Sequence, residues 1–246
     1  MRRALNVGAG VALGALLACA PPSAPAQAET AATIAPSFSP DRLGARGALT
    51  LTVDYTGELG LPSPVRRSIV ELPAGLGLDI PTLRSCGAAR LRTHGASGCP
   101  AQSQIGGGHA LLVGDAGSQV ISESVRLWVF LGPLHGFQPT FLVLAQGRTP
   151  LQERIVLSGN VIPATAPYGE ALAIDVPPIP TLPLEPDASL ATLTLTVGMR
   201  AQHLARDANA VVVPGSCPAG GFPFATESSY ADGSTSSDLA TATCPQ

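Results

Sequence analysis

Strict alternation of apolar residues with threonine constrains the fold of this chain more than any other feature. In ALTLTVDY (48–55), leucine, valine and tyrosine occupy every second position, with threonine or aspartate between them. SLATLTLTVGM (189–199) repeats the pattern. Because successive side chains of a strand point to opposite faces, each segment predicts a strand with one buried and one solvated face. Such strands are typical of antiparallel sheets.

Other short runs are rich in β-branched or aromatic residues and are bounded by Gly or Pro, which predicts further strands. These runs are 68–72, 109–115, 119–132, 140–147, 153–160, 171–177 and 221–228, and the residues before Cys244 could add one more. The run 119–132 is long enough to bend or to form two strands. The 27 Gly and 24 Pro suit a loop-rich β protein. We therefore predict an all-β fold, an antiparallel β-sandwich of immunoglobulin-like or jelly-roll-like type with Pro/Gly-rich loops.

Two stretches interrupt the strands. Between residues 73 and 100, Asp79 and Ser85 are candidate caps of short helical turns, and the glycine run 106–108 is expected to be a flexible approach to the strand at His109. The segment VPPIPTLPLEPD (176–187) is proline-rich and favours an extended path. We favour a single β-sandwich domain over 29–246, with 176–187 crossing between its parts. The alternative is two small β domains divided there.

The first 28 residues resemble an export signal. Two arginines precede an uncharged apolar run that is too short to cross a membrane, and Ala26-Gln27-Ala28 fits cleavage before Glu29. We therefore predict a signal peptide over 1–28 and a secreted or cell-envelope location. The alternative is a lipoprotein signal over 1–18, because the residues before Cys19 resemble a lipobox. Cys19 would then be lipidated, and the mature chain would contact a membrane only through that lipid.

Four cysteines remain after the leader: Cys86, Cys99, Cys217 and Cys244. An even number of cysteines in an exported chain predicts disulfides. The local pairing, between cysteines that are neighbours in the sequence, joins Cys86 to Cys99 and Cys217 to Cys244. A zinc site built from Cys86, His94, Cys99 and His109 is the alternative, but it lacks the close cysteine pair of structural zinc sites. We therefore expect two disulfides and no metal.

Few residues suggest catalysis. The chain has no lysine, which excludes a Ser-x-x-Lys nucleophile, a Schiff-base enzyme and a P-loop, and it has neither Gly-x-Ser-x-Gly nor His-Glu-x-x-His. A formal net charge of −3 without a basic run argues against a nucleic-acid partner. No stretch after residue 28 is apolar for long enough to form a transmembrane helix. We assign no catalytic residue and no cofactor.

A few residues are candidates for binding loops. Trp128 lies within a predicted strand and is expected in the core. Tyr168 and Tyr230 lie near Gly-rich turns and are the aromatic residues expected to be exposed. Asp232 lies in YADGST (230–235), which predicts an Asp-Gly hairpin turn rather than a calcium site.

Several segments carry a family resemblance. They are LPAGLGLDIPTLRSC, GCPAQSQIGGGHALL, CPAGGFPF and YADGST followed by ATCP. Together they resemble parts of uncharacterised exported proteins of high-GC bacteria. In those proteins a Cys-Pro pair precedes a Ser-x-Ile-Gly segment, and a Phe-rich strand with an Asp-Gly turn leads to a terminal cysteine. The resemblance covers most of residues 34–245. It implies a secreted β-sandwich with two disulfides, and it implies no activity.

Three functions follow as hypotheses. The first is a non-catalytic secreted or envelope-associated protein that binds an extracellular or envelope ligand or has a structural role. The alternative is an exported hydrolase that acts on glycans through a carboxylate pair, which can come from distant segments. The third is carriage of an apolar ligand inside the β fold, which the high apolar content favours. We favour the first.

Overall fold

The computed structural model describes residues 30–57, 60–79, 83–115, 117, 119–136, 138–148, 154–181, 185–198 and 210–245. The predicted signal peptide and Cys19 lie outside these residues. Within them, no helix is long and apolar enough to cross a membrane.

The described chain forms thirteen strands and a short helical excursion between β4 and β5. The strands are β1 (Ala31–Ser39), β2 (Arg46–Thr56), β3 (Val65–Pro73), β4 (Gly77–Leu78), β5 (Gln104–Asp115), β6 (Val120–Leu131), β7 (Thr140–Gln146), β8 (Arg154–Pro163), β9 (Tyr168–Asp175), β10 (Ser189–Val197), β11 (Val211–Val212), β12 (Phe222–Tyr230) and β13 (Thr235–Ala242). The excursion comprises α1 (Ala88–His94) and the 3₁₀ turns η2 (Gly95–Gly98) and η3 (Ala101–Ser103).

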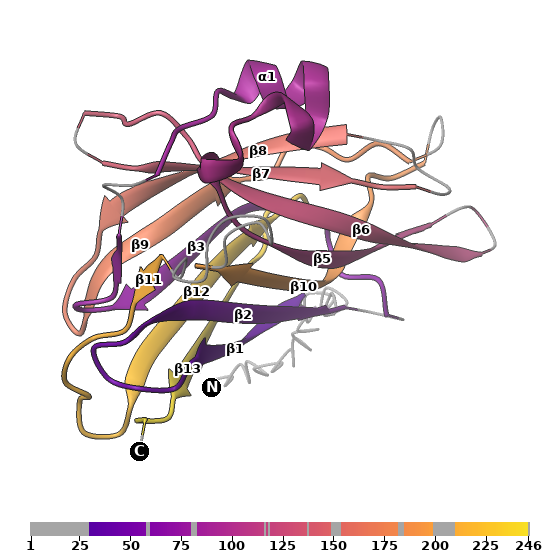
Figure 1. The fold of residues 1–246 in the computed structure, drawn as a ribbon. Coiled ribbons are helices and arrows are strands. Elements are labelled where there is room, and N and C mark those ends of the chain that lie inside the picture. Colours follow the sequence, from indigo (N-terminus) through magenta and orange to yellow (C-terminus); the bar gives the residue numbers. More distant parts are fainter. Residues whose placement is uncertain are drawn as a thin grey trace, which may run out of the picture.

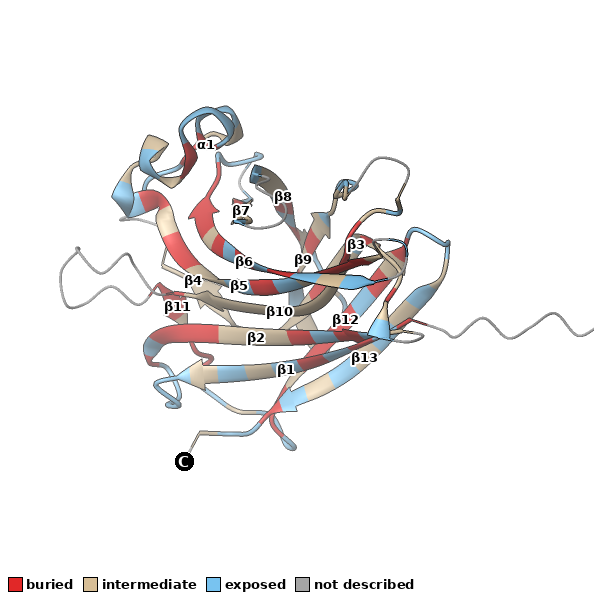
Figure 2. Ribbon diagram, turned by 90° about the vertical axis from the view of Figure 1, so that its right-hand side faces the viewer, coloured by how far each residue is buried: buried red, intermediate tan, exposed pale blue. Residues whose placement is uncertain are grey.

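The long strands form one continuous sheet in the order β13-β12-β3-β9-β8-β7-β6-β5-β10-β2-β1, and every described pair is antiparallel. The short strands β11 and β4 extend from the start of β2. The sheet curls into a half-barrel, and its strands can be followed around the curl in Figures 1 and 2. The edge strands β1 and β13 approach each other, and the Ile34 N–H donates a hydrogen bond to the Asp238 carboxylate at 2.8 Å.

The prediction of an antiparallel all-β fold with two disulfides is confirmed. The strands belong to one curled sheet, however, and the structure establishes neither an immunoglobulin-like nor a jelly-roll-like sandwich. The alternating pattern does not distinguish a sandwich from a curled sheet. Each strand has one buried and one solvated face whether two sheets pack together or one sheet curls on itself.

The two alternating segments lie side by side as β2 and β10. Their leucine and valine side chains face the interior of the curl, and their threonines face outward. Across this pair the Thr50 and Thr196 hydroxyls are 2.9 Å apart, and those of Thr52 and Thr194 are 3.3 Å apart. Cross-strand hydroxyl pairs of this kind help to hold a register.

The glycine run expected to approach a strand instead belongs to that strand, since β5 begins at Gln104. A Cβ atom added at Gly106 would overlap the Thr196 carbonyl oxygen, and one at Gly108 would overlap the Thr194 carbonyl oxygen. Glycine is therefore required here for the close approach of the β10 backbone. The glycine run therefore indicates close strand packing rather than a flexible segment.

Other strand predictions differ from the structure mainly at their ends. The run 119–132 forms the single strand β6, and the predicted strand at 171–177 begins earlier, at Tyr168. β1, β4 and β11 were not predicted. β1 contains Pro36 and lies at an edge of the sheet, where proline is tolerated.

The interior of the half-barrel is packed densely towards one end. Phe222 and Phe224 of β12 are fully buried there, and Phe38 of β1 packs against both rings at centroid distances of 5.5 and 6.1 Å. At the same end the buried apolar cluster of β5, β6 and β7 includes Ile105 and Leu131. This packed end forms the floor of the curl.

The helical excursion covers the outer face of the sheet over β6, β7 and β8 (Figure 1). Leu91 of α1 is fully buried and belongs to a cluster with Phe130, Leu142 and Leu144. Trp128 packs beside this cluster and is half-buried, with the Arg126 guanidinium 4.9 Å from its ring centroid.

The helix begins after Gly87 without a side-chain cap, so the prediction that Ser85 caps it is wrong. Asp79, the other predicted cap, forms an ion pair with Arg46 at 2.5 Å. This carboxylate therefore contributes to a contact between the loop and β2.

Candidate ligand cavity

An apolar cavity of about 140 Å³ lies inside the curl, between the packed floor and the open end of the half-barrel. Its walls are the inward-facing side chains of β2, β3, β5, β6, β7, β8, β9 and β10. Leucine, valine, isoleucine and alanine account for most of them, including Leu51, Val70, Ala110, Leu127, Leu157 and Leu195. The strand pattern creates this lining directly, because each strand contributes every second residue to the interior.

The cavity is partly open to solvent. Many of its inward-facing apolar side chains are consequently half-buried rather than buried, among them Leu157, Leu172, Leu193 and Leu195. Figure 2 shows the effect along β10, most of which has intermediate burial although it is paired on both sides, with β5 and β2. An apolar inner surface that keeps contact with water is a surface that a ligand can cover.

The proline-rich segment connects β9 to β10, which belong to one sheet and are separated in it by β8, β7, β6 and β5. Its described residues lie at the open end of the curl. Val176, Pro177, Ile179 and Ala188 line the cavity. We call the described residues 176–181 and 185–188 the mouth segment.

Two contacts of Arg66 hold the mouth segment against β3, and a third contact joins the two described parts of the segment. The Val176 N–H donates to the Arg66 carbonyl oxygen at 2.8 Å, and the Ala188 N–H donates to the Ile179 carbonyl oxygen at 2.8 Å. The Arg66 guanidinium also forms an ion pair with Asp187 at 2.8 Å. Arg66 therefore joins β3 to both ends of the segment.

Among the described residues, four polar side chains line the cavity: Tyr55, Arg66, Ser68 and Glu123. Glu123 lies on β6, is 3% exposed and accepts a hydrogen bond from the Arg148 N–H at 2.6 Å. Its position continues the inward face of Ile121, Val125 and Leu127, so a carboxylate within an apolar stripe was the sequence signal for it. Arg126, three residues later, is exposed on the outer face.

Tyr55 belongs to a cluster of hydroxyl groups beside the cavity. Its ring is perpendicular to that of Tyr230, with centroids 6.5 Å apart. Burial raises the pKa of Tyr55 to about 12. The phenol is therefore neutral at physiological pH and retains a proton to donate.

The predicted binding-loop residues do not form one site. Tyr230 is 4% exposed, and its hydroxyl lies 2.5 Å from the Ser236 hydroxyl, so the expectation that it is exposed is wrong. Asp232 is exposed, and its carboxylate accepts hydrogen bonds from the Ser234 backbone and hydroxyl at 2.8 and 2.6 Å, as expected of a hairpin turn. Tyr168 is half-buried and pairs with Pro73, at the other end of β3 from Tyr230.

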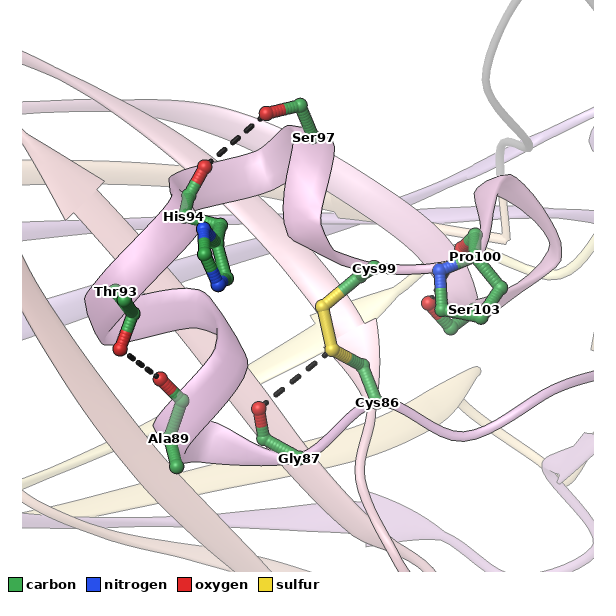
Figure 3. The surroundings of a disulfide bond; sticks show 9 residues. All are labelled: Cys86, Gly87, Ala89, Thr93, His94, Ser97, Cys99, Pro100 and Ser103. Carbon is green, nitrogen blue, oxygen red and sulfur yellow. Dashed lines mark hydrogen bonds between the residues drawn. A yellow bond between two sulfur atoms is a disulfide. The ribbon is translucent and has the colours of Figure 1, made fainter.

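The cysteines form two disulfides with the expected pairing, Cys86–Cys99 and Cys217–Cys244. Figure 3 shows the first bridge closing the base of the α1 excursion. With both sulfurs of Cys86 and Cys99 bonded to each other, the zinc site with His94 and His109 is not formed. Among the described residues, no group of three or more His, Cys, Asp or Glu side chains is placed to hold a metal ion.

Comparison with known proteins found no matching family model, no matching curated protein and no matching solved structure. The cavity is therefore interpreted from its own chemistry.

Proposed function

We propose that this protein is a non-catalytic, extracytoplasmic binding protein that holds an apolar ligand inside its curled sheet. The observation that carries the proposal is the partly open apolar cavity beneath the mouth segment. Ligand sites are typically concave and apolar, with a few polar groups that orient the ligand. Side chains that line an unfilled apolar cavity lack van der Waals contacts on one side, and a ligand that enters the cavity supplies them.

The volume sets the size of the bound group. A cavity of about 140 Å³ is close to the roughly 150 Å³ apolar cavity known to accept benzene. It therefore accommodates a small ring or one segment of a hydrocarbon chain. The rest of a larger ligand would extend past the mouth segment into solvent.

The leader and the disulfides support an extracytoplasmic site of action. Disulfides persist where the surroundings are oxidising, and the N-terminal sequence predicts export. Cleavage before Glu29 would release the protein, whereas a lipid on Cys19 would anchor it to a membrane. The cavity would be the same in both cases. The intact mass of the mature N-terminus distinguishes the two.

The alternative of a glycan hydrolase has less support. Glycosidases need two carboxyl groups roughly 5–10 Å apart. Among the described residues that line the cavity, Glu123 is the one carboxylate, and the lining has no aromatic platform other than the buried Tyr55. No described feature favours hydrolysis over binding.

The test is a titration of the delipidated mature protein with the neutral apolar dye N-phenyl-1-naphthylamine, whose fluorescence increases in apolar surroundings. Ala110→Phe places a ring in the cavity, and Ala35→Phe, on the exposed face of β1, is the matched control. We expect saturable binding by the wild type and by Ala35→Phe, and at least tenfold weaker binding by Ala110→Phe.

Wild-type protein without saturable binding would refute the proposal, as would an unchanged affinity in Ala110→Phe. Circular dichroism establishes that each variant is folded. Ala145→Phe, which also lines the cavity, replaces Ala110→Phe if the latter fails to fold.

A further inference from the structure

The polar groups of the cavity are divided between two walls. Tyr55 of β2 and Arg66 and Ser68 of β3 lie on one wall, and each of these side chains can donate a hydrogen bond. The opposite wall, formed by β5 to β10, is apolar apart from the Glu123 carboxylate. A ligand that follows this division has an apolar body and one polar group that accepts hydrogen bonds.

Arg66 determines what that polar group can be. Its side chain is 34% exposed at the mouth, and one terminal nitrogen donates to the Asp187 carboxylate at 2.8 Å. A guanidinium has five N–H donors in a planar fork that matches a carboxylate. Among the described residues, Asp187 is the one side chain that pairs with this guanidinium, so further donors remain for a second acceptor.

Arg66 also gives the ligand its direction. The opposite wall is lined mainly by apolar side chains, and its buried Glu123 side chain accepts a hydrogen bond from the Arg148 N–H. A negatively charged group is therefore favoured on the Arg66 side of the mouth, where a guanidinium is present. There it also remains in contact with water, so its charge does not have to be fully desolvated.

We propose that the ligand is a single-chain amphiphile with a carboxylate head, of the fatty-acid class. The carboxylate lies at the mouth against Arg66, with Ser68 and Tyr55 on the same wall, and the hydrocarbon chain extends into the cavity. Asp187 shows that a carboxylate is accommodated beside this guanidinium, and it competes with the ligand for it. This inference rests on the proposed function and adds the chemical class of the ligand.

Chain length follows from the volume. Each methylene that enters the cavity is expected to tighten binding about fourfold, until the cavity is filled. A cavity of about 140 Å³ fills with a short to medium chain. The affinity of straight-chain carboxylates should therefore rise steeply from six carbon atoms and then level off.

The experiment measures displacement of N-phenyl-1-naphthylamine by octanoate, methyl octanoate and octylamine, which share a chain and differ in head charge. Arg66→Gln removes the proposed head contact. Arg67→Gln is the matched control, because Arg67 is the adjacent residue, faces outward and pairs with the exposed Asp175 at 2.6 Å. Asp187→Asn removes the competing carboxylate.

For the wild type, we expect octanoate to bind at least tenfold more tightly than octylamine or methyl octanoate. Arg66→Gln should abolish that preference while dye binding persists, and Arg67→Gln should retain it. Asp187→Asn should tighten octanoate binding severalfold, because the ligand then has no competitor at Arg66.

The inference is overturned if the dye binds but octanoate shows no preference over its ester and amine. It is also overturned if Arg67→Gln weakens octanoate binding as much as Arg66→Gln does. If the dye itself does not bind, the proposed function fails rather than the ligand class alone.

Discussion

Filling the cavity with a side chain should stabilise the protein and remove its response to ligand at the same time. Ala110 is 5% exposed and lines the cavity. An unfilled volume of 140 Å³ costs about 3.4 kcal/mol at roughly 24 cal/mol per Å³, and this is an upper limit because the cavity is partly open. Strain from a less than ideal fit offsets part of the gain. We expect Ala110→Phe to raise the free energy of unfolding by about 1–2 kcal/mol.

Urea denaturation with and without octanoate measures both effects. A ligand present at 100 times its dissociation constant stabilises the wild type by about 2.7 kcal/mol, whereas Ala110→Phe should gain almost nothing. Ala35→Phe, on the exposed face of β1, should match the wild type in both measurements. The reasoning is refuted if Ala110→Phe is destabilised and still gains the wild-type increment from the ligand.

Two further predictions concern covalent and titratable groups outside the mouth. Replacing Cys217 and Cys244 by alanine should lower the free energy of unfolding by about 3.6 kcal/mol, from the loop-closure entropy of 27 residues, and a loss below 1 kcal/mol in urea denaturation would contradict this. Because burial holds the pKa of Tyr55 at about 12, deprotonation favours the unfolded chain, and stability should fall as pH rises from 10 to 12 by about 2 kcal/mol. Tyr55→Phe should flatten this fall in unfolding curves recorded across that range, and an unchanged slope would show that Tyr55 is not its source.

The sequence predicted the elements that depend on local pattern. The alternation of threonine with apolar residues predicted β2 and β10, and the even number of cysteines predicted two disulfides. Both patterns can be interpreted without knowledge of the tertiary structure, and both predictions are confirmed. β1 was missed because Pro36 and short polar residues obscure its alternation. Its place depends on pairing with β2, which is not a local property.

The cavity could not be predicted in the same way. Its two walls come from strands distant in the chain, and the close approach of β10 to β5 requires glycine at 106 and 108, which the pattern suggested were a flexible approach to the strand. Tyr230 illustrates the same difficulty, because its nearby glycines suggested exposure whereas packing against Tyr55 buries it. Glu123 was within reach of sequence reasoning, since it is the charged residue at an inward position of β6.

Methyl NMR observes the interior of the curl itself. In a titration of the mature, delipidated protein with octanoate, we expect the methyl signals of Leu127, Leu157 and Leu195, which line the cavity, to shift and saturate together. The signals of Leu111 and Leu239, which are 39% and 76% exposed, should stay in place. Shifts confined to Leu111 and Leu239, or no saturable shift at all, would contradict a ligand held inside the sheet.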